Sequence, residues 1–236
     1  MLYYGGTMSP EQLSAARRRV GLSQQQAAAR LGVSQPYLSL LEQGRRPLTT
    51  ALARKMMRIY GLSPTALPLR QGAVPAARLE PDELARQLAG LGYPGFAWLR
   101  TRRQRNPAEV LFAALAQSDL ETRLTEALPW VVYRYADLDW EWLLARARQF
   151  ELQNRLGYVT HLAGRLARRH KEGSKVVLLA VMESRLDRAR LAREDTLCHD
   201  SLSEAERRWL RRHRPAPARH WNLLTDLSPE HLTHAA

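Results

Sequence analysis

Only two residues separate two predicted helices near the N-terminus, and this short connection restricts the fold more than any other feature of the sequence. Ser23 is typical of a helix N-cap, and Gly32 is typical of a helix end. Ser34 predicts the start of the next helix, which runs to about Gln43. Because only Gly32 and Val33 connect them, the two helices must cross steeply, and the N-terminal end of the second helix is expected to stand exposed.

Similar start and end signals surround this helix pair. Ser9 predicts a preceding helix that Gly21 ends, and a fourth helix is predicted to begin near Thr49 or Thr50. Ser63 then opens a short fifth turn. Apolar residues recur three and four positions apart in the longer segments, which is typical of helices that pack around one core. The N-terminal part is therefore predicted to be a five-helix domain with a helix-turn-helix, a motif whose second helix can enter the major groove of DNA.

The segment LSQQQAAARLGVSQPYLSLLEQGRRPL resembles the Xre/Cro phage-repressor family of helix-turn-helix domains. The resemblance rests on a Leu-Ser-Gln entry, a Leu-Gly-Val-Ser turn and a Glu-x-Gly-x-Arg exit, in this order, and extends over about residues 9–67. It implies a lambda-repressor-like domain that binds a double-stranded DNA operator and represses transcription.

The same resemblance implies which side chains face the base edges. By position in the motif these are Gln35, Pro36, Ser39 and Leu40. The Gln35 amide can form two hydrogen bonds with adenine, and the Ser39 hydroxyl can donate or accept. Pro36 has no backbone N–H to donate, so it contributes only to the shape of the contact surface. Leu40 departs from the usual polar choice of the family and could instead touch a thymine methyl group, so the operator sequence stays open.

A second set of residues is expected to contact the DNA backbone. Gln24 begins the first helix of the pair, where its side chain and backbone N–H can bond a phosphate. Tyr37 could contact phosphate or only pack, and for the arginines at positions 17–19 a solvated helix face is an equally good interpretation. The predicted phosphate contacts are Gln24, Tyr37, Arg45, Arg46, Arg17 and Arg18.

The charge distribution agrees with a polyanionic partner. The net charge is +13, and residues 1–70 hold ten Lys and Arg against only Glu11 and Glu42. Neutralising phosphates releases counterions, so such a segment favours nucleic acid, although a basic surface without a ligand is the alternative interpretation. No apolar run could span a membrane, no secretory signal is visible, and the single Cys198 cannot form an intramolecular disulfide. A cytoplasmic, nucleoid-associated bacterial protein is expected.

Prolines and glycines between residues 61 and 81 predict the domain boundary, because they break helices and stiffen the chain. Beyond them only helical signals recur, so the chain is predicted to be all-α. The expected organisation is a helix-turn-helix domain at 1–70, a Pro/Gly-containing linker with a first helix at 71–105, and a helical dimerisation or partner-binding domain at 106–236.

Caps and proline positions predict the helices of the second part. Strand-like alternation is absent from the sequence there. The first predicted helices run from Pro81 to Ala89, from Asn106 to about Gln117, and from a capping box at Ser118 to a point before Pro129. A long helix is predicted from Asp137 or Asp139 to about His170, and another from Ser174 to about Arg193. The last predicted helix runs from Ser203 to about His213, where Pro215 and Pro217 end it, and the tail after Arg219 is expected to be loosely structured.

Seven aromatic residues fall between positions 130 and 158. They can form a helical core, or some of them can form a partner-binding surface, because Trp and Tyr are favoured interface anchors. Trp140 and Trp142 lie about 200° apart around a helix. One of these two residues is therefore a candidate for a dimer or partner contact.

Residues 128–167 look like the C-terminal region of Xre-type regulators encoded beside abortive-infection-type nucleotidyltransferase toxins. That resemblance implies an antitoxin that binds a cognate toxin and represses its own operon. A homodimer is expected for a different reason, because a single helix in one major groove buries too little surface for strong specificity. The alternative is a stand-alone regulator whose helical domain dimerises or senses a small ligand. The sequence carries none of the zinc-peptidase, nucleophile or phosphate-loop patterns that would indicate an enzyme, so no catalytic residue, metal or cofactor is expected.

Overall fold

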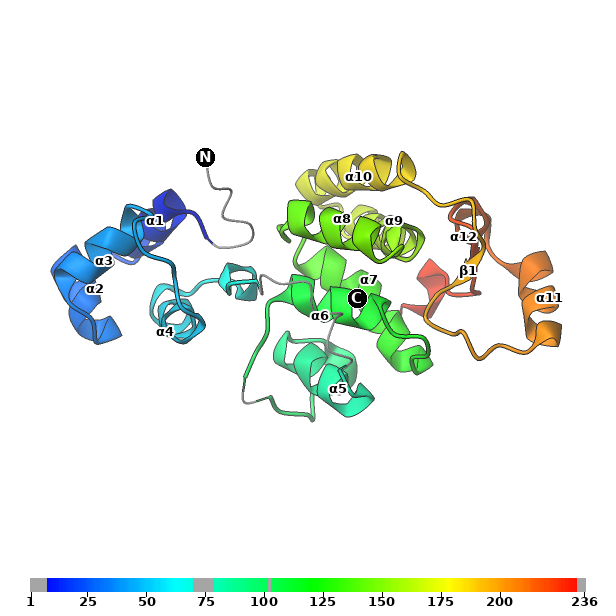
Figure 1. The fold of residues 1–236 in the computed structure, drawn as a ribbon, viewed down its shortest axis with the longest axis horizontal. Helices are drawn as coiled ribbons and strands as arrows, with labels where there is room; N and C mark the ends of the chain where they lie inside the picture. Colours follow the sequence, from blue (N-terminus) through cyan, green and yellow to red (C-terminus); the bar gives the residue numbers. More distant parts are fainter. Residues whose placement is uncertain (1–7, 70–78, 102, 233–236) are drawn as a thin grey trace. The chain divides into compact units, whose positions relative to one another are not determined.

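The computed structural model describes residues 8–69, 79–101 and 103–232 and divides into two compact units, Met1–Gln71 and Gly72–Ala236 (Figure 1). Each unit has its own hydrophobic core. Of the predicted linker, Gly72 and Pro75 lie outside the described residues. No helix in the described part of the chain is both long and apolar enough to cross a membrane.

The N-terminal unit is built from short helices whose starts match the sequence prediction. Ser9, Ser23, Ser34 and Thr49 each accept a hydrogen bond from a backbone N–H in the first turn of the helix that follows. The elements are α1 (Pro10–Arg19), α2 (Gln24–Leu31), α3 (Gln35–Glu42), α4 (Thr50–Tyr60) and a 3₁₀ turn, η1 (Pro64–Ala66).

The connection between α2 and α3 is as tight as the sequence predicts. Gly32 ends α2 in the left-handed conformation at a φ of 70°, which a residue with a side chain adopts at a cost. Leu31 and Leu38 then pack into the core on either side of the turn, with Met56 and Tyr60 of α4. The core thus fixes the angle between the two helices.

The C-terminal unit is also mostly helical, which confirms the all-α prediction. Among its described residues there is one pair of two-residue strands, which run parallel. The elements are α5 (Pro81–Gly90), η2 (Pro94–Phe96), α6 (Pro107–Leu115), α7 (Thr122–Arg134), α8 (Trp140–Gln149), α9 (Gln153–Arg169), α10 (Gly173–Asp187), β1 (Asp195–Thr196), α11 (Glu204–His213), α12 (Ala216–His220), β2 (Leu223–Leu224) and η3 (Pro229–His231).

Helix α9 is the central helix of this unit, with contacts to α7, α8, α10 and α12. Its Arg155 is buried and donates hydrogen bonds to the Asp195 carboxylate at 2.8 and 2.9 Å and to the backbone oxygens of Leu115 and Gln117. Burial alone would lower the pKa of Arg155, but Asp195 and the neighbouring charges raise it above its ordinary value. Arg155 therefore ties the loop before α11 to the end of α6 as a permanent cation.

The predicted single helix from Asp139 to His170 is wrong, because the chain breaks it into α8 and α9. Asp139 does cap α8, but Glu151 adopts a φ of 57° and ends it. The N–H of Leu152 donates to the carbonyl of Ala147 across this turn, as in helix ends that normally carry glycine. Lys171 makes the same kind of turn after α9, at a φ of 58°.

The predicted helix boundaries around α7 are also wrong. This helix starts at Thr122 rather than at Ser118, and Pro129 lies inside it instead of following its end. An internal proline removes one backbone hydrogen bond and costs about 3 kcal/mol. Burial of Trp130, Val131 and Val132 just beyond the proline offsets this cost and keeps the helix continuous.

The described part of the C-terminal tail, up to Leu232, packs instead of being loosely structured. Pro215 and Pro217 do not only end α11, since they also begin α12. Trp221 is 1% exposed and packs on Gly157 of α9, and the Tyr158 hydroxyl donates a hydrogen bond to the Leu227 carbonyl. The absence of a side chain at Gly157 thus provides room for an indole ring.

We expect Gly157→Ala to destabilise the C-terminal unit by about 2 kcal/mol, because a Cβ there would overlap the buried Trp221 ring. Gly164→Ala is the matched control in the same helix. A Cβ built at Gly164 meets no atom within 4 Å other than the adjacent backbone of its own helix, so this substitution should stabilise by about 0.5–1 kcal/mol. Urea unfolding followed by tryptophan fluorescence reports this unit, since all six tryptophans belong to it. Equal effects of the two substitutions would contradict the packing role of Gly157.

Candidate nucleic-acid interface

The outer face of α3 carries the four residues predicted to read bases. Gln35 and Pro36 are exposed, and Ser39 and Leu40 are half-buried. The opposite side of the helix is held in the core by buried leucines, Leu38 and Leu41. The helix therefore presents one stripe outward, in which Gln35 and Ser39 are polar and Pro36 and Leu40 are apolar, while its buried side fixes its orientation.

Sequence reasoning missed one residue of this stripe. Gln43 follows the last residue of α3, is exposed, and donates from its side-chain nitrogen to the Ser39 hydroxyl at 3.0 Å. The spacing of four positions from Ser39 would have placed it on the same face. Its amide adds a second group with the donor and acceptor pattern that suits adenine.

A chain of hydrogen bonds connects the stripe to the start of α2. The Gln35 side-chain nitrogen donates to the Gln24 oxygen at 2.8 Å, and the Gln24 nitrogen donates to the Glu42 carboxylate at 2.9 Å. Gln24 is therefore positioned by α3 as well as by its own helix. In this arrangement the predicted phosphate contact and the predicted adenine contact orient each other.

Glu42 is held by Arg17 at the centre of this network. The Arg17 guanidinium donates two hydrogen bonds to the Glu42 carboxylate, at 2.7 and 3.0 Å, and a third to the Leu22 carbonyl at 2.7 Å. The Glu42 side chain is only 5% exposed. The prediction that Arg17 contacts phosphate is therefore wrong, because its donors already have partners inside the domain.

The electrostatics of the pair agree with this structural role. Burial acts to raise the pKa of Glu42, but the hydrogen bonds from Arg17 and Gln24 and the Arg17 charge outweigh it, so the pKa lies below its ordinary value. The hydrogen bond to Glu42 likewise raises the pKa of Arg17. The carboxylate and the guanidinium stay charged at neutral pH.

The other predicted phosphate contacts differ in how accessible they are. Arg45 and Arg46 are exposed in the loop after α3, and no described residue pairs with either of them. Arg18 is exposed on α1 and bonds Ser14 of the same helix at 2.9 Å. Tyr37 is half-buried and packs against the core. Arg45 and Arg46 are thus the cations best placed beside the α3 stripe.

The two candidate partner tryptophans separate as the helical geometry predicts. Trp140 is buried and donates from its indole nitrogen to the Ala136 carbonyl at 2.9 Å, so it is a core residue and not a partner contact. Trp142 is half-buried, with its ring edge against Phe112. The most exposed tryptophans are instead Trp98 and Trp209, at 63% and 52%, which the sequence did not single out.

We expect Glu42→Gln to lower the free energy of unfolding of the N-terminal unit by about 2–3 kcal/mol, because it leaves the buried Arg17 charge without its partner. The folded-state pKa of Glu42 is lowered, so its contribution is present above the ordinary pKa of 4.5 and is lost as the pH falls below that value. Hydrogen exchange of α1 and α3 amides in the full chain measures both effects.

Glu11→Gln is the control for the loss of one carboxylate, since Glu11 is exposed on α1. It should change the stability by less than about 1 kcal/mol. A Glu42→Gln variant with unchanged protection and an unchanged acid response would show that the ion pair does not hold α3 in place.

Comparison with known proteins agrees with this geometry. Residues 11–69 match the family model described as a helix-turn-helix domain. No curated protein and no solved structure matches the chain. The match includes α2, α3 and the turn between them, so residues 11–69 form a helix-turn-helix domain, and such a domain indicates DNA binding and a role in transcriptional regulation.

Proposed function

We propose that the chain is a sequence-specific repressor that binds a double-stranded DNA operator as a homodimer, and that it acts by binding rather than by catalysis. The observation that carries the proposal is the outward-facing stripe of α3. The hydrogen bonds among Gln35, Gln24 and Glu42 orient it, and the exposed Arg45 and Arg46 border it. Amides oriented in this way suit adenine edges in the major groove, and the arginines suit the phosphate backbone.

Dimerisation follows from the amount of DNA that one such helix can contact. A single helix in one major groove buries too little surface for strong specificity, and proteins of this kind gain it by reading two half-sites about one helical turn apart. The C-terminal unit, whose helices surround α9, is the part of the chain that we assign to self-association.

We expect Gln35→Ala to weaken binding to the preferred site by about 1–3 kcal/mol and to change binding to random duplex very little. Arg45→Ala is the matched comparison, because it removes a backbone contact from the same surface. It should weaken binding to all duplexes alike and flatten the salt dependence. Fluorescence anisotropy with the selected site and a scrambled duplex at several salt concentrations measures both. An equal loss on the two duplexes for Gln35→Ala would remove this residue from the base-reading set.

The antitoxin role implied by residues 128–167 forms the more specific part of the proposal. Its support is the sequence resemblance alone. The test is co-expression of the full chain with the product of the neighbouring gene. We expect the chain to rescue the cells from the toxicity of that product and to form a stable complex with it. If the chain does neither, it is a stand-alone regulator.

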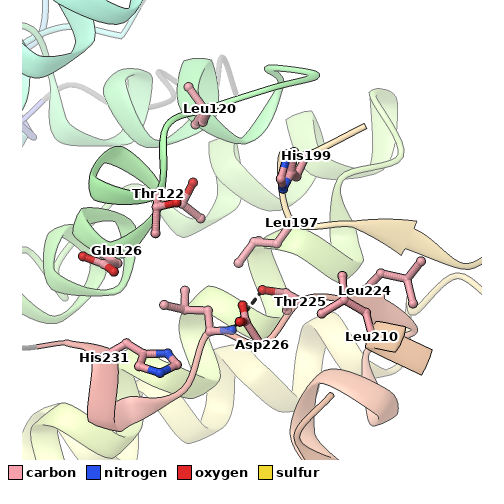
Figure 2. Close-up of a pocket in the computed structure, with 12 residues that line it drawn as sticks. Leu120, Thr122, Glu126, Leu197, His199, Leu210, Leu224, Thr225, Asp226 and His231 are labelled. Atoms are coloured by element: carbon pink, nitrogen blue, oxygen red, sulfur yellow. Dashed lines mark hydrogen bonds between the residues drawn. The ribbon is translucent and has the colours of Figure 1, made fainter. Parts of the chain in front are cut away.

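One observation favours the alternative of a ligand-responsive regulator. The C-terminal unit has a pocket of about 270 Å³ between α7, the loop before α11 and the segment from β2 to η3 (Figure 2). Leu197, Leu224 and Leu227 contribute apolar lining, and Glu126 and Asp226 contribute carboxylates. His199 and His231 also line the pocket, so a small polar ligand that hydrogen-bonds to both carboxylates and imidazoles would suit this combination. Such a regulator would change its operator affinity when the pocket is filled.

A further inference from the structure

Helix α11 has a surface that the proposed function does not use. It lies at the edge of the C-terminal unit (Figure 1), and Leu210 is its only buried residue. Its remaining side chains therefore face the solvent or its immediate neighbours. Between positions 207 and 214 the sequence holds five arginines and no carboxylate.

Three of these arginines have partners within the unit. Arg207 donates to the carbonyls of Leu202 and Asp200, and Arg211 pairs with Glu194 and Glu204. Arg214 donates to the Leu223 carbonyl at 3.0 Å. These contacts hold α11 in its place. The positive charge on the outermost side of the helix therefore comes from the other two arginines, Arg208 and Arg212.

Arg208 and Arg212 are exposed on the side of α11 opposite to Leu210. Arg208 makes only a hydrogen bond to the Glu204 carbonyl of its own helix, and no described residue pairs with Arg212. Four positions apart, they lie about 6 Å from each other along the axis. Two guanidinium groups that have no carboxylate partner among the described residues and lie at this spacing can contact neighbouring phosphates of one nucleic-acid strand.

An aromatic pair borders these two arginines. The rings of Trp209 and His213 are stacked, with centroids 4.5 Å apart and planes inclined by 21°. Trp209 is 52% exposed, which is a large apolar area to leave in water. The stack gives a flat surface on which another ring can lie, and its geometry is set before any ligand arrives.

We propose that Arg208, Trp209, Arg212 and His213, here called the α11 crest, bind single-stranded nucleic acid. The arginines contact phosphates, and an unpaired base stacks on the Trp209–His213 pair. In a duplex the faces of the bases are already covered by their neighbours, so an aromatic surface of this kind selects unpaired bases. This inference concerns a different helix from α3 and does not rest on the proposed repressor function.

Two other classes of partner fit the α11 crest less well. A membrane surface requires a continuous apolar face on the helix, and Leu210 is buried while Trp209 is the only large exposed apolar residue of α11. An acidic protein would pair with the arginines but would make no specific use of stacked rings. Both classes are outcomes of the test.

The test uses the full chain with Arg45→Ala and Arg46→Ala as the background, so that the helix-turn-helix contributes little to non-specific binding. The probe is a fluorescein-labelled single strand of mixed sequence, about 12 nucleotides long, with its own duplex, polyglutamate and anionic lipid vesicles as competitors. We expect Trp209→Ala to weaken single-strand binding roughly ten-fold and to leave the salt dependence unchanged.

The double variant Arg208→Ala/Arg212→Ala should weaken binding and also reduce the slope of log affinity against log salt by roughly 1.4, about 0.7 for each phosphate contact. Trp98→Ala and Arg148→Ala are the controls, because they remove an indole that is at least as exposed as that of Trp209 and an exposed arginine, both outside α11. Neither should change single-strand affinity, and thermal unfolding should be similar for all variants.

The proposal is overturned if the Trp209→Ala variant binds the single strand as the background protein does. It is also overturned if the duplex, polyglutamate or the vesicles compete as well as the unlabelled single strand. A loss of operator binding in Gln35→Ala with unchanged single-strand affinity would leave the inference standing, so the two proposals fail separately.

Discussion

The contact between Arg17 and Glu42 is the interaction on which the N-terminal domain depends. It joins α1 to the end of α3 through two hydrogen bonds, with the carboxylate almost completely buried. The same carboxylate accepts from Gln24, which in turn accepts from Gln35. A charged pair taken out of water is costly unless its hydrogen bonds are complete, and here the carboxylate has three donors. The position of the exposed stripe therefore follows from a network inside the domain.

The C-terminal unit uses the same solution with different residues. Arg155 is buried in α9 and connects two carboxylates and two backbone carbonyls that are distant in the sequence. Beside it, burial raises the pKa of the Cys198 thiol to about 12, so this cysteine is a neutral core residue at physiological pH. In each unit a buried arginine thus holds together segments that the hydrophobic core alone would leave free to shift.

The sequence predicts the N-terminal domain well because its signals are local. Serine and threonine caps and the glycine at position 32 define the helices without reference to the rest of the chain. The break between α8 and α9 could not be predicted in this way, because Glu151 takes a conformation that normally marks glycine. Pro129 inside α7 and the packed tail around Trp221 depend on burial by distant residues. The burial of Arg17 has the same cause, since its partner is 25 positions away.

The most direct test of the account is to identify which groove of the DNA the protein contacts. Full-length protein would first select its site from a pool of random duplexes, and that site would then be partly methylated with dimethyl sulfate and offered to the protein again. The account predicts that methylation of guanine N7, in the major groove, blocks binding wherever a guanine lies within or beside the bases opposite α3. It also predicts no effect of methylation at adenine N3, in the minor groove. Interference only from the minor groove, or selection of no site at all, would contradict the claim that the exposed face of α3 reads DNA.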